Sequence, residues 1–373
     1  MGYISSSILT FIPFPYHGGL QEFAIKLACR LRIPLLVIGD KYSVPNDVIE
    51  ELRGHRIKVY WIQQDLSMLR NPLIVNPKIY YRIARFLKEY DVIHFHGPFP
   101  IVGDILLRNN ATFIFTYHYD IELRNVALRV IASAYNHLLL SETLRKAKVV
   151  TASSKYFIEE SPYLKRFSSK VKILPLGVDT SSLIPTFKYE PKIVFVGRII
   201  PEKGIDVLIR AFELASRSNL ELKLFVIGKP VDLRYWSHLR QYIWRKGLRD
   251  KVILTGYLPR DKMIEVLKSS SILVLPSVTK LDSFGIVLLE ASSLAIPIIS
   301  TTIVPGAREL IEKAQNGILI PPGDHYALAE AMKKILENPR EYGLRGREYV
   351  VKHHDWNIVT QIVQQMYKLV LQV

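Results

Sequence analysis

The sequence has almost no cysteine and no long apolar segment. Its 373 residues include one cysteine, Cys29, so an internal disulfide framework and a cysteine-built zinc site are both excluded. No apolar run reaches the ~18 residues that a membrane-spanning helix needs. The apolar stretch at residues 8–14 lacks the basic lead and the small-residue cleavage site of a signal peptide. We therefore expect a cytoplasmic protein in a reducing compartment.

Acidic residues are outnumbered: 34 Asp and Glu stand against 50 Lys and Arg, which gives a formal net charge of +16. This excess favours an acidic partner, such as nucleic acid, an anionic lipid surface or a phosphorylated substrate. Residues 1–185 and residues 186–373 each carry a net charge of +8, so no tail or arm concentrates the charge. The chain also lacks a recognised nucleic-acid-binding motif. We expect no nucleic-acid partner, and the other two partners stay open.

Short β-branched, apolar runs alternate with helical patterns along the chain. Runs of consecutive apolar residues are typical of strands buried on both faces of a parallel sheet. The predicted strands are residues 8–12, 35–38, 92–95, 113–115, 193–196, 224–227, 252–254, 272–275 and 297–299. We predict an α/β fold with two doubly wound, Rossmann-like domains facing each other across a cleft. Open α/β sheets bind ligands beyond the carboxyl ends of their strands, so the site should lie there.

The domain boundary is predicted in the turn-rich segment that follows residue 179 and has no clear periodicity. Residues 1–180 are predicted to form an N-terminal domain, and residues 181–355 a C-terminal domain. Residues 356–373 have apolar side chains at helical spacing and predict an amphipathic helix. This helix has a face to bury, and a return to the N-terminal domain is one place for it.

A loop with two cations follows the predicted strand 193–196. It contains Gly197 and Arg198 and ends in Lys203 and Gly204, just before a predicted helix. A helix N-terminus carries partial positive charge, and two added cations would match a diphosphate. The alternative is a solvated loop whose charges only cap their neighbours.

Two carboxylates, Asp282 and Glu290, stand eight residues apart. We expect a helix that starts near Phe284, which places Asp282 in the preceding loop and Glu290 about two turns into the helix. Because Glu290 is surrounded by apolar residues, its carboxylate needs a hydrogen-bonding partner. A pair of sugar hydroxyls would serve, and so would a buried salt bridge with an arginine.

Gly18 and Gly19 come between the first predicted strand and the first helix, where they would let the backbone approach a ligand. Histidines follow other strands, at His94, His96 and His118. No cysteine or nearby acidic pair completes a metal-ligand set, so we expect no metal. The sequence also has no Asp-x-Asp and no Walker loop, so phosphate charge would be met by basic side chains and backbone N–H groups.

Taken in chain order, these elements resemble the retaining glycosyltransferases of family 4, which have the GT-B fold. The resemblance spans nearly the whole chain. Its markers are Gly18-Gly19 with Glu22, the strand end from His94 to His96, Leu174-Pro175-Leu176-Gly177-Val178-Asp179, Gly197-Arg198 with Glu202-Lys203-Gly204, Gly256-Tyr257-Leu258, Asp282 with Glu290, Asn316-Gly317, and Pro321-Pro322-Gly323-Asp324.

The resemblance implies that the C-terminal domain holds a nucleotide sugar. Arg198 and Lys203 would contact its diphosphate as catalytic residues. His118, a third catalytic residue, would orient sugar hydroxyls or stabilise positive charge, with a purely structural histidine as the alternative. The fourth is Asp282, which stands where the family usually has Glu and so leaves the sugar undetermined. The donor-binding residues would be Gly18, Gly19, Gly197, Gly256, Leu258, Phe284, Gly285, Ile286, Val287 and Glu290, with Glu290 on the ribose and the loop near Gly256 and Leu258 facing the base. The N-terminal domain would be the acceptor side.

The activity that the resemblance implies is transfer of a hexose-type sugar with retention of configuration, without a metal or any other cofactor. UDP is favoured as the carrier, with GDP as the alternative. The leaving diphosphate would accept the acceptor's proton, so catalysis depends on stabilising the departing negative charge. A function of another class is a non-catalytic protein that binds sugar nucleotides or nucleic acid through its positive charge.

Residues 77–90 and 124–148 mix basic and apolar side chains. Such segments can lie on an anionic bilayer, or they can be ordinary helices whose apolar face is core, which we favour for most positions. The surplus of positive charge still favours a glycan or lipid-linked acceptor and a peripheral position on the cytoplasmic membrane face.

Overall fold

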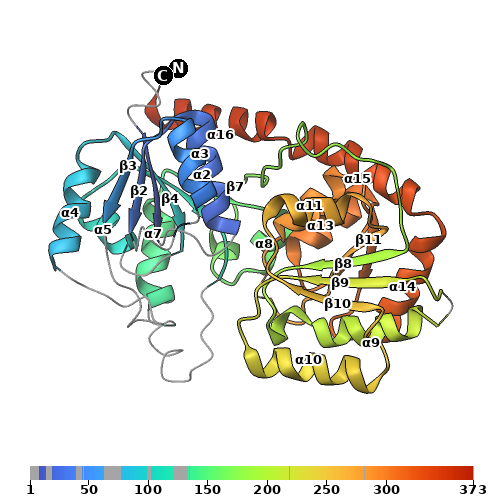
Figure 1. Cartoon of the computed structure of the whole chain (residues 1–373). Helices are drawn as coiled ribbons and strands as arrows, with labels where there is room; N and C mark the ends of the chain where they lie inside the picture. The colour runs from blue at the N-terminus through green and yellow to red at the C-terminus, as the bar shows by residue number, and fades with distance from the viewer. Residues whose placement is uncertain are drawn as a thin grey trace. The chain divides into compact units, whose positions relative to one another are not determined.

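The computed structural model describes residues 8–13, 19–38, 44, 46–62, 77–98, 102–120, 133, 135–217, 219–280 and 282–372. The chain forms two compact units: Met1–Leu176 together with Val359–Val373, and Gly177–Ile358. Each unit is built on one parallel sheet flanked by helices, as Figure 1 shows element by element. The predicted α/β class with two Rossmann-like domains is confirmed.

The first unit contains a seven-stranded sheet in the order β3-β2-β1-β4-β5-β6-β7. Its strands are β1 (Ile8–Pro13), β2 (Leu35–Ile38), β3 (Val59–Ile62), β4 (Val92–Gly97), β5 (Phe113–Tyr117), β6 (Val149–Ala152) and β7 (Val171–Ile173). Its helices include α2 (Gly19–Leu31), α3 (Asn46–Gly54), α4 (Pro77–Leu87), α5 (Val102–Arg108), the π-helix η2 (Asn136–Leu140), α7 (Ser141–Lys146), α8 (Lys155–Glu160) and the short η3 (Leu164–Phe167). From Val359 onward, α16 (Trp356–Leu371) belongs to this unit.

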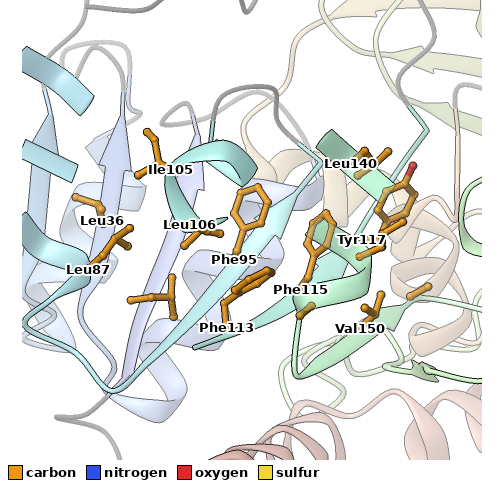
Figure 2. Packing of buried hydrophobic residues seen from close by; sticks show 14 of the residues in the cluster. Leu36, Leu87, Phe95, Ile105, Leu106, Phe113, Phe115, Tyr117, Leu140 and Val150 are labelled. Carbon is orange, nitrogen blue, oxygen red and sulfur yellow. The ribbon is translucent and has the colours of Figure 1, made fainter. Parts of the chain in front are cut away.

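The two faces of this sheet have different chemistry. Phe95 of β4 and Phe115 and Tyr117 of β5 belong to one apolar cluster, in which the Phe95 and Phe115 rings stack with centroids 4.9 Å apart (Figure 2). Side chains alternate along a strand, so His94 and His96 project from the opposite face of β4. The sequence period of two therefore separates the aromatic cluster from the histidines, which share their face of the sheet with a second apolar cluster that includes Leu35 and Val37.

The second unit contains a six-stranded sheet in the order β10-β9-β8-β11-β12-β13. Its strands are β8 (Lys192–Val196), β9 (Lys223–Ile227), β10 (Val252–Gly256), β11 (Ile272–Leu275), β12 (Ile298–Thr301) and β13 (Gly317–Ile320). Its helices include the short η4 (Pro201–Lys203), α9 (Ile205–Ala215), α10 (Leu233–Arg245), α11 (Arg260–Lys268), α12 (Ile286–Ser293), α13 (Pro305–Ala314), α14 (His325–Glu337) and α15 (Pro339–His353).

Several helices of the second unit begin at a capping side chain. Asp232 accepts hydrogen bonds from the backbone N–H groups at the start of α10, and Asp324 accepts from Ala327 at the start of α14. These contacts satisfy N–H groups that have no partner within the helix. α12 has no such cap: Gly285 precedes it with a left-handed φ of +89°. The first turn of α12 therefore keeps backbone donors for another partner.

The nine predicted strands all fall on observed strands, but four observed strands were not predicted. β7 has three residues and lies at the sheet edge, and β3 is only half-buried along most of its length. β13 opens on Gly317. In β6, only Val149 and Val150 precede Thr151. Strands this short or this mixed carry too few apolar positions for a periodic signal.

The segment at residues 77–90 contains α4, whose apolar face is core. Ile83 and Leu87 are buried in the first unit's main cluster, while Tyr81 is 74% exposed. The core interpretation therefore holds for the inward positions. The first part of the other mixed segment, residues 124–132, lies outside the described residues.

The segments that open and close the second unit lie side by side. The backbone N–H of Val178 donates to the His354 carbonyl at 2.8 Å, and that of Trp356 donates to the Val178 carbonyl at 3.2 Å. The Trp356 ring is buried against Gly177, where an added Cβ would lie 2.4 Å from a ring carbon. Glycine is therefore required here by space.

We predict that Gly177→Ala destabilises the second unit by about 1–3 kcal/mol, because the added methyl group overpacks the Trp356 ring. Urea unfolding followed by circular dichroism measures the change. The matched control is Gly54→Ala, at the end of α3, where a Cβ meets no atom within 4 Å. Equal unfolding free energies for Gly177→Ala and the unchanged protein would contradict this packing.

Candidate functional site

The strand order of the second unit reverses between β8 and β11. These two strands pair in parallel, with β9 and β10 beyond β8 and with β12 and β13 beyond β11. Open α/β sheets bind ligands at the carboxyl ends of the strands where such a reversal occurs. Two loops leave this point, residues 197–204 after β8 and residues 276–285 after β11.

A buried ion pair joins the two loops. The Lys203 ammonium donates to both carboxylate oxygens of Asp282, at 2.5 and 2.7 Å, and the Ser277 hydroxyl donates to the same carboxylate at 2.5 Å. The side chains of Lys203 and Asp282 are only 10% and 14% exposed. Two of the predicted catalytic residues are therefore brought together, with charges that compensate each other.

Backbone contacts fix the same two loops. The N–H of Val278 donates to the Glu202 carbonyl at 2.9 Å. Gly204 adopts a left-handed φ of +65°, and a Cβ there would lie 2.3 Å from the Pro276 carbonyl oxygen. Only glycine fits this close approach. Lys203 therefore extends from a rigid turn.

Arg198, the other predicted cation, is exposed on the loop after β8. Within the described residues its guanidinium has no hydrogen bond or ion pair. The next residue, Ile199, is buried and is bonded through its backbone to Lys229 and Val231. The loop is thus held by Ile199 while Arg198 keeps its donors for a ligand.

Glu290 is buried on α12 and paired with Arg260. Its side chain is 6% exposed, and its Oε1 lies 2.5 Å from Nη1 of Arg260, the first residue of α11. Sugar hydroxyls and an arginine were the two expected partners of the Glu290 carboxylate, and the structure shows an arginine, Arg260. Burial of a carboxylate requires such a counter-charge, because an unpaired buried charge is strongly destabilising.

The expected start of α12 near Phe284 is wrong: the helix begins at Ile286. The left-handed Gly285 keeps Phe284 and Gly285 out of the helix, so Glu290 lies about one turn from the start rather than two. Phe284 is buried against Gly306, where a Cβ would lie 2.1 Å from its ring. This contact fixes the loop that carries the backbone N–H groups of residues 284–287.

The predicted base-binding loop follows β10. Gly256 is left-handed, with a φ of +70°, and Leu258 is half-buried. The backbone N–H of Gly228 donates to the Gly256 carbonyl, and a Cβ on Gly228 would lie 1.8 Å from the Gly197 carbonyl oxygen. Gly228 therefore allows the backbone at the end of β9 to approach the Gly197 carbonyl at the end of β8.

In the first unit, three buried histidines stack along the face of the sheet opposite the aromatic cluster. His94 bonds Tyr367 of α16 at 2.6 Å through Nδ1 and Thr116 at 2.7 Å through Nε2. His96 Nδ1 lies 3.1 Å from His118 Nε2, so one of these nitrogens donates and the other accepts. The His94 and His96 rings lie 4.3 Å apart, and those of His96 and His118 lie 5.4 Å apart.

Burial keeps these histidines neutral. It lowers the pKa of His94 to about 3, with a smaller contribution from His118, and it lowers the pKa of His118 to about 3. Burial together with the neighbouring histidines holds the pKa of His96 well below its usual range. His118 therefore offers a neutral imidazole at neutral pH.

Gly18 lies outside the described residues, and Gly19 is exposed at the start of α2. Across the part of the chain that the structure describes, no group of three or more His, Cys, Asp or Glu side chains is placed to hold a metal ion. No helix formed by those residues is long and apolar enough to span a bilayer.

Four residues of these clusters were not predicted. Ser277 stands two residues after the end of β11, so its place at a strand end was a usable signal. Arg260 stands just after the predicted base-binding loop, but nothing in the sequence pairs it with Glu290. Tyr367 and Thr116 meet His94 only through the fold, since Tyr367 is 273 residues away along the chain.

Comparisons with known proteins identify relatives for both units. The family model described as "Glycosyltransferase Family 4" matches residues 25–182, and the model described as "Glycosyl transferases group 1" matches residues 184–350. The two matches lie one after the other and together span most of the chain.

The relatives include two mannosyltransferases. The O-antigen chain mannosyltransferase C of Escherichia coli is 28% identical over an alignment of 280 residues, which covers 71% of this chain and 72% of that protein. The phosphatidyl-myo-inositol mannosyltransferase of Mycobacterium leprae is 23% identical over an alignment of 376 residues, which covers 96% of this chain and 94% of the relative. The crystal structure of Anabaena Alr3699/HepE in complex with UDP and glucose matches with a TM-score of 0.75 at 19% identity, over 97% of this chain and 99% of that one.

The neutral histidines predict a pH dependence of stability. The unfolded chain binds protons near pH 6.5, which His94 and His118 in the folded unit do not bind until about pH 3. The unfolding free energy should therefore be full above pH 6.5 and should fall as the pH drops below it, by up to about 1.4 kcal/mol per pH unit for each histidine. Urea unfolding between about pH 7.5 and pH 5 measures this slope.

His96→Phe should reduce the slope of the unfolding free energy against pH by the contribution of about one proton. The control is His55→Gln, which replaces an exposed histidine and should leave the slope unchanged. A slope that is the same in His96→Phe and in the unchanged protein would show that the cluster does not set it.

Proposed function

Because the chain belongs to the family 4 glycosyltransferases of group 1, we propose that it transfers a hexose-type sugar from a nucleoside diphosphate to a glycan or lipid-linked acceptor. Retention at the anomeric carbon and independence of a metal are part of the proposal. The observation that carries it is the buried Lys203–Asp282 pair, which lies where the strand order reverses between β8 and β11. The loop after β8 that carries Lys203 also carries the exposed Arg198.

Lys203 is suited to a diphosphate because its position is fixed before the ligand arrives. An ammonium group has three N–H donors, and Lys203 directs contacts to two Asp282 oxygens, so a third donor can bond a phosphate oxygen. Arg198 would add a second cation. The uncapped first turn of α12 supplies backbone N–H groups and partial positive charge.

The proposed step breaks the bond between the anomeric carbon and the diphosphate oxygen. The bond from the acceptor oxygen to the anomeric carbon forms on the same face, and the acceptor's proton passes to the leaving diphosphate. Negative charge grows on the diphosphate as the first bond breaks. Fixed donors aimed at such a charge are typically worth about 10²–10³ in turnover each. Lys203 and Arg198 are the side chains assigned to this task.

The carrier is proposed as UDP, with GDP as the alternative. The structural neighbour solved with UDP and glucose supports the first, and the two relatives named mannosyltransferases support a hexosyl group. Asp282 is assigned to the sugar, and its carboxylate is fixed by both Lys203 and Ser277. His118 is assigned as a neutral group that orients sugar hydroxyls.

We predict that Arg198→Ala weakens binding of the nucleoside diphosphate by about ten- to a hundredfold, because it removes charge-assisted hydrogen bonds. Transfer should fall by about 10²–10³. Calorimetry with UDP and GDP, and transfer assays with the matching sugar nucleotides, measure both effects. Arg198 has no partner among the described residues, so the fold should not change.

Lys203→Ala should lose transfer as well, and its melting temperature separates lost function from the cost of leaving Asp282 unpaired. The control is Arg240→Ala, an exposed arginine of α10. Repeating the titrations in EDTA should leave binding and transfer intact. Near-normal transfer in Arg198→Ala, or loss of transfer in EDTA, would overturn the corresponding assignment. Binding without transfer to any acceptor would favour a non-catalytic binding protein.

A lipid-linked acceptor and a peripheral position on the cytoplasmic membrane face remain our proposal for the acceptor side. α4 supports it, because the exposed Tyr81 lies beside exposed Arg82 and Arg85, while Ile83 and Leu87 face the core. A helix with buried apolar residues and an exposed aromatic and basic face can rest on anionic lipid.

Co-sedimentation with phosphatidylglycerol vesicles at low salt should therefore be reduced at least about tenfold by Arg82→Glu with Arg85→Glu, since each basic residue near an anionic surface contributes about 1 kcal/mol. The control pair is Lys262→Glu with Lys334→Glu, two exposed lysines of the second unit. Sedimentation of the unchanged protein that does not depend on vesicle charge would argue for a soluble acceptor.

A further inference from the structure

Arg260 is the residue that the proposed function leaves unused. It is the first residue of α11 and comes directly after the loop of residues 256–259 that follows β10. Its guanidinium Nη1 lies 2.5 Å from Glu290 Oε1. The two side chains differ in burial, at 41% exposed for Arg260 and 6% for Glu290. An arginine that is partly open to solvent thus reaches a carboxylate that is almost fully enclosed.

We propose that Arg260 is a positioning residue for the nucleoside: it holds the Glu290 carboxylate in place for the ribose hydroxyls and stays on it when the donor binds. This inference rests on the proposed function, because it takes Glu290 as the ribose contact. It adds a residue that acts through Glu290.

The burial of Glu290 is the reason that Arg260 stays. Ribose hydroxyls are neutral, so they can bond the carboxylate but cannot compensate its charge. Removing the guanidinium would take away a counter-charge that lies 2.5 Å from this buried carboxylate, which is costly. The first turn of α12 has no acidic or basic side chain, and Lys203 is engaged by Asp282.

The carboxylate can serve both partners at once. An ionised carboxylate has about four lone-pair sites, and the short contact from Arg260 reaches one oxygen, Oε1. The guanidinium is a rigid fork, so its contact also fixes the plane of the carboxylate. Two vicinal hydroxyls are best met by an acceptor whose direction is fixed beforehand.

The candidate site residues of the second unit therefore form two separate carboxylate–cation pairs. Lys203–Asp282 joins the loops after β8 and β11, whereas Arg260–Glu290 joins α11 to α12. We assign the first pair to the diphosphate and sugar and the second pair to the nucleoside. A substitution at Arg260 should then change how the ribose is read.

The test compares a ribonucleotide with its 2′-deoxy form. Calorimetry with UDP and GDP first shows which one the unchanged protein binds, and the matching 2′-deoxy nucleotide is then titrated. The unchanged protein should prefer the ribonucleotide by about tenfold or more, as expected for hydrogen bonds to a charged group. Arg260→Ala should bring this ratio close to one, and Arg260→Lys should keep part of it.

Lys262→Ala is the matched control, because Lys262 lies on the same helix and pairs only with exposed Glu265 at 3.0 Å. Its ratio should match that of the unchanged protein. Glu290→Gln keeps the shape of the side chain and removes the buried charge, so it reports on the same contact if Arg260→Ala fails to fold. In the Glu290→Gln background, adding Arg260→Ala should have no further effect on the ratio.

Two results would overturn the inference. An unchanged ribose preference in Arg260→Ala would show that Arg260 does not position Glu290. Tighter ribonucleotide binding in Arg260→Ala would show that the arginine competes with the ribose. If the unchanged protein binds neither UDP nor GDP, the proposed function itself fails, and the inference fails with it. Each of these three results is distinct in the same set of titrations.

Discussion

The geometry of the second unit's site depends on one buried interaction, the ion pair between Lys203 and Asp282. An ammonium and a carboxylate removed from water are tolerated only together, so the loops that carry them must meet. The backbone hydrogen bond from Val278 to Glu202 and the close approach of Gly204 to Pro276 join the same two loops. The carboxyl ends of β8 and β11 are thereby joined before any ligand is present.

The same principle governs Glu290, which is buried deeper and has Arg260 as its partner. In each of the two pairs, the carboxylate and the cation fix each other's direction. Arg198 differs, since it is exposed and has no partner within the described residues. The candidate site of the second unit thus combines two prearranged ion pairs, Lys203–Asp282 and Arg260–Glu290, with the exposed guanidinium of Arg198. Preorganisation of this kind removes part of the ordering cost of binding.

In the first unit, the division between aromatic core and histidine face follows from strand alternation. Phe95 and Phe115 enter the apolar cluster, while His94 and His96 project to the other face. The histidines are neutral because that face is also closed to water. One strand therefore serves two environments that differ in polarity, with no change in backbone geometry.

The fold could be predicted from the sequence to a large extent because strands of a buried parallel sheet have short, continuous apolar sequences. β8 and β11 were found in this way, and the loop after β8 marked Lys203 as a candidate phosphate ligand, which stays a prediction. What could not be predicted were contacts between distant segments, such as Arg260 with Glu290, since periodicity says nothing about which side chains meet. The start of α12 was misplaced for a local reason, the left-handed Gly285, which sequence alone does not reveal.

The membership of residues 359–373 in the first unit has a consequence for biosynthesis. A ribosome synthesises residues 1–176 long before it reaches Tyr367, whose hydroxyl is the partner of His94. During translation, the His94 imidazole has no Tyr367 partner until α16 is made, and the whole second unit is made before that. The first unit therefore reaches its final hydrogen bonding only after the whole second unit has been made, so a ribosome that stops before Tyr367 leaves His94 without its hydroxyl partner.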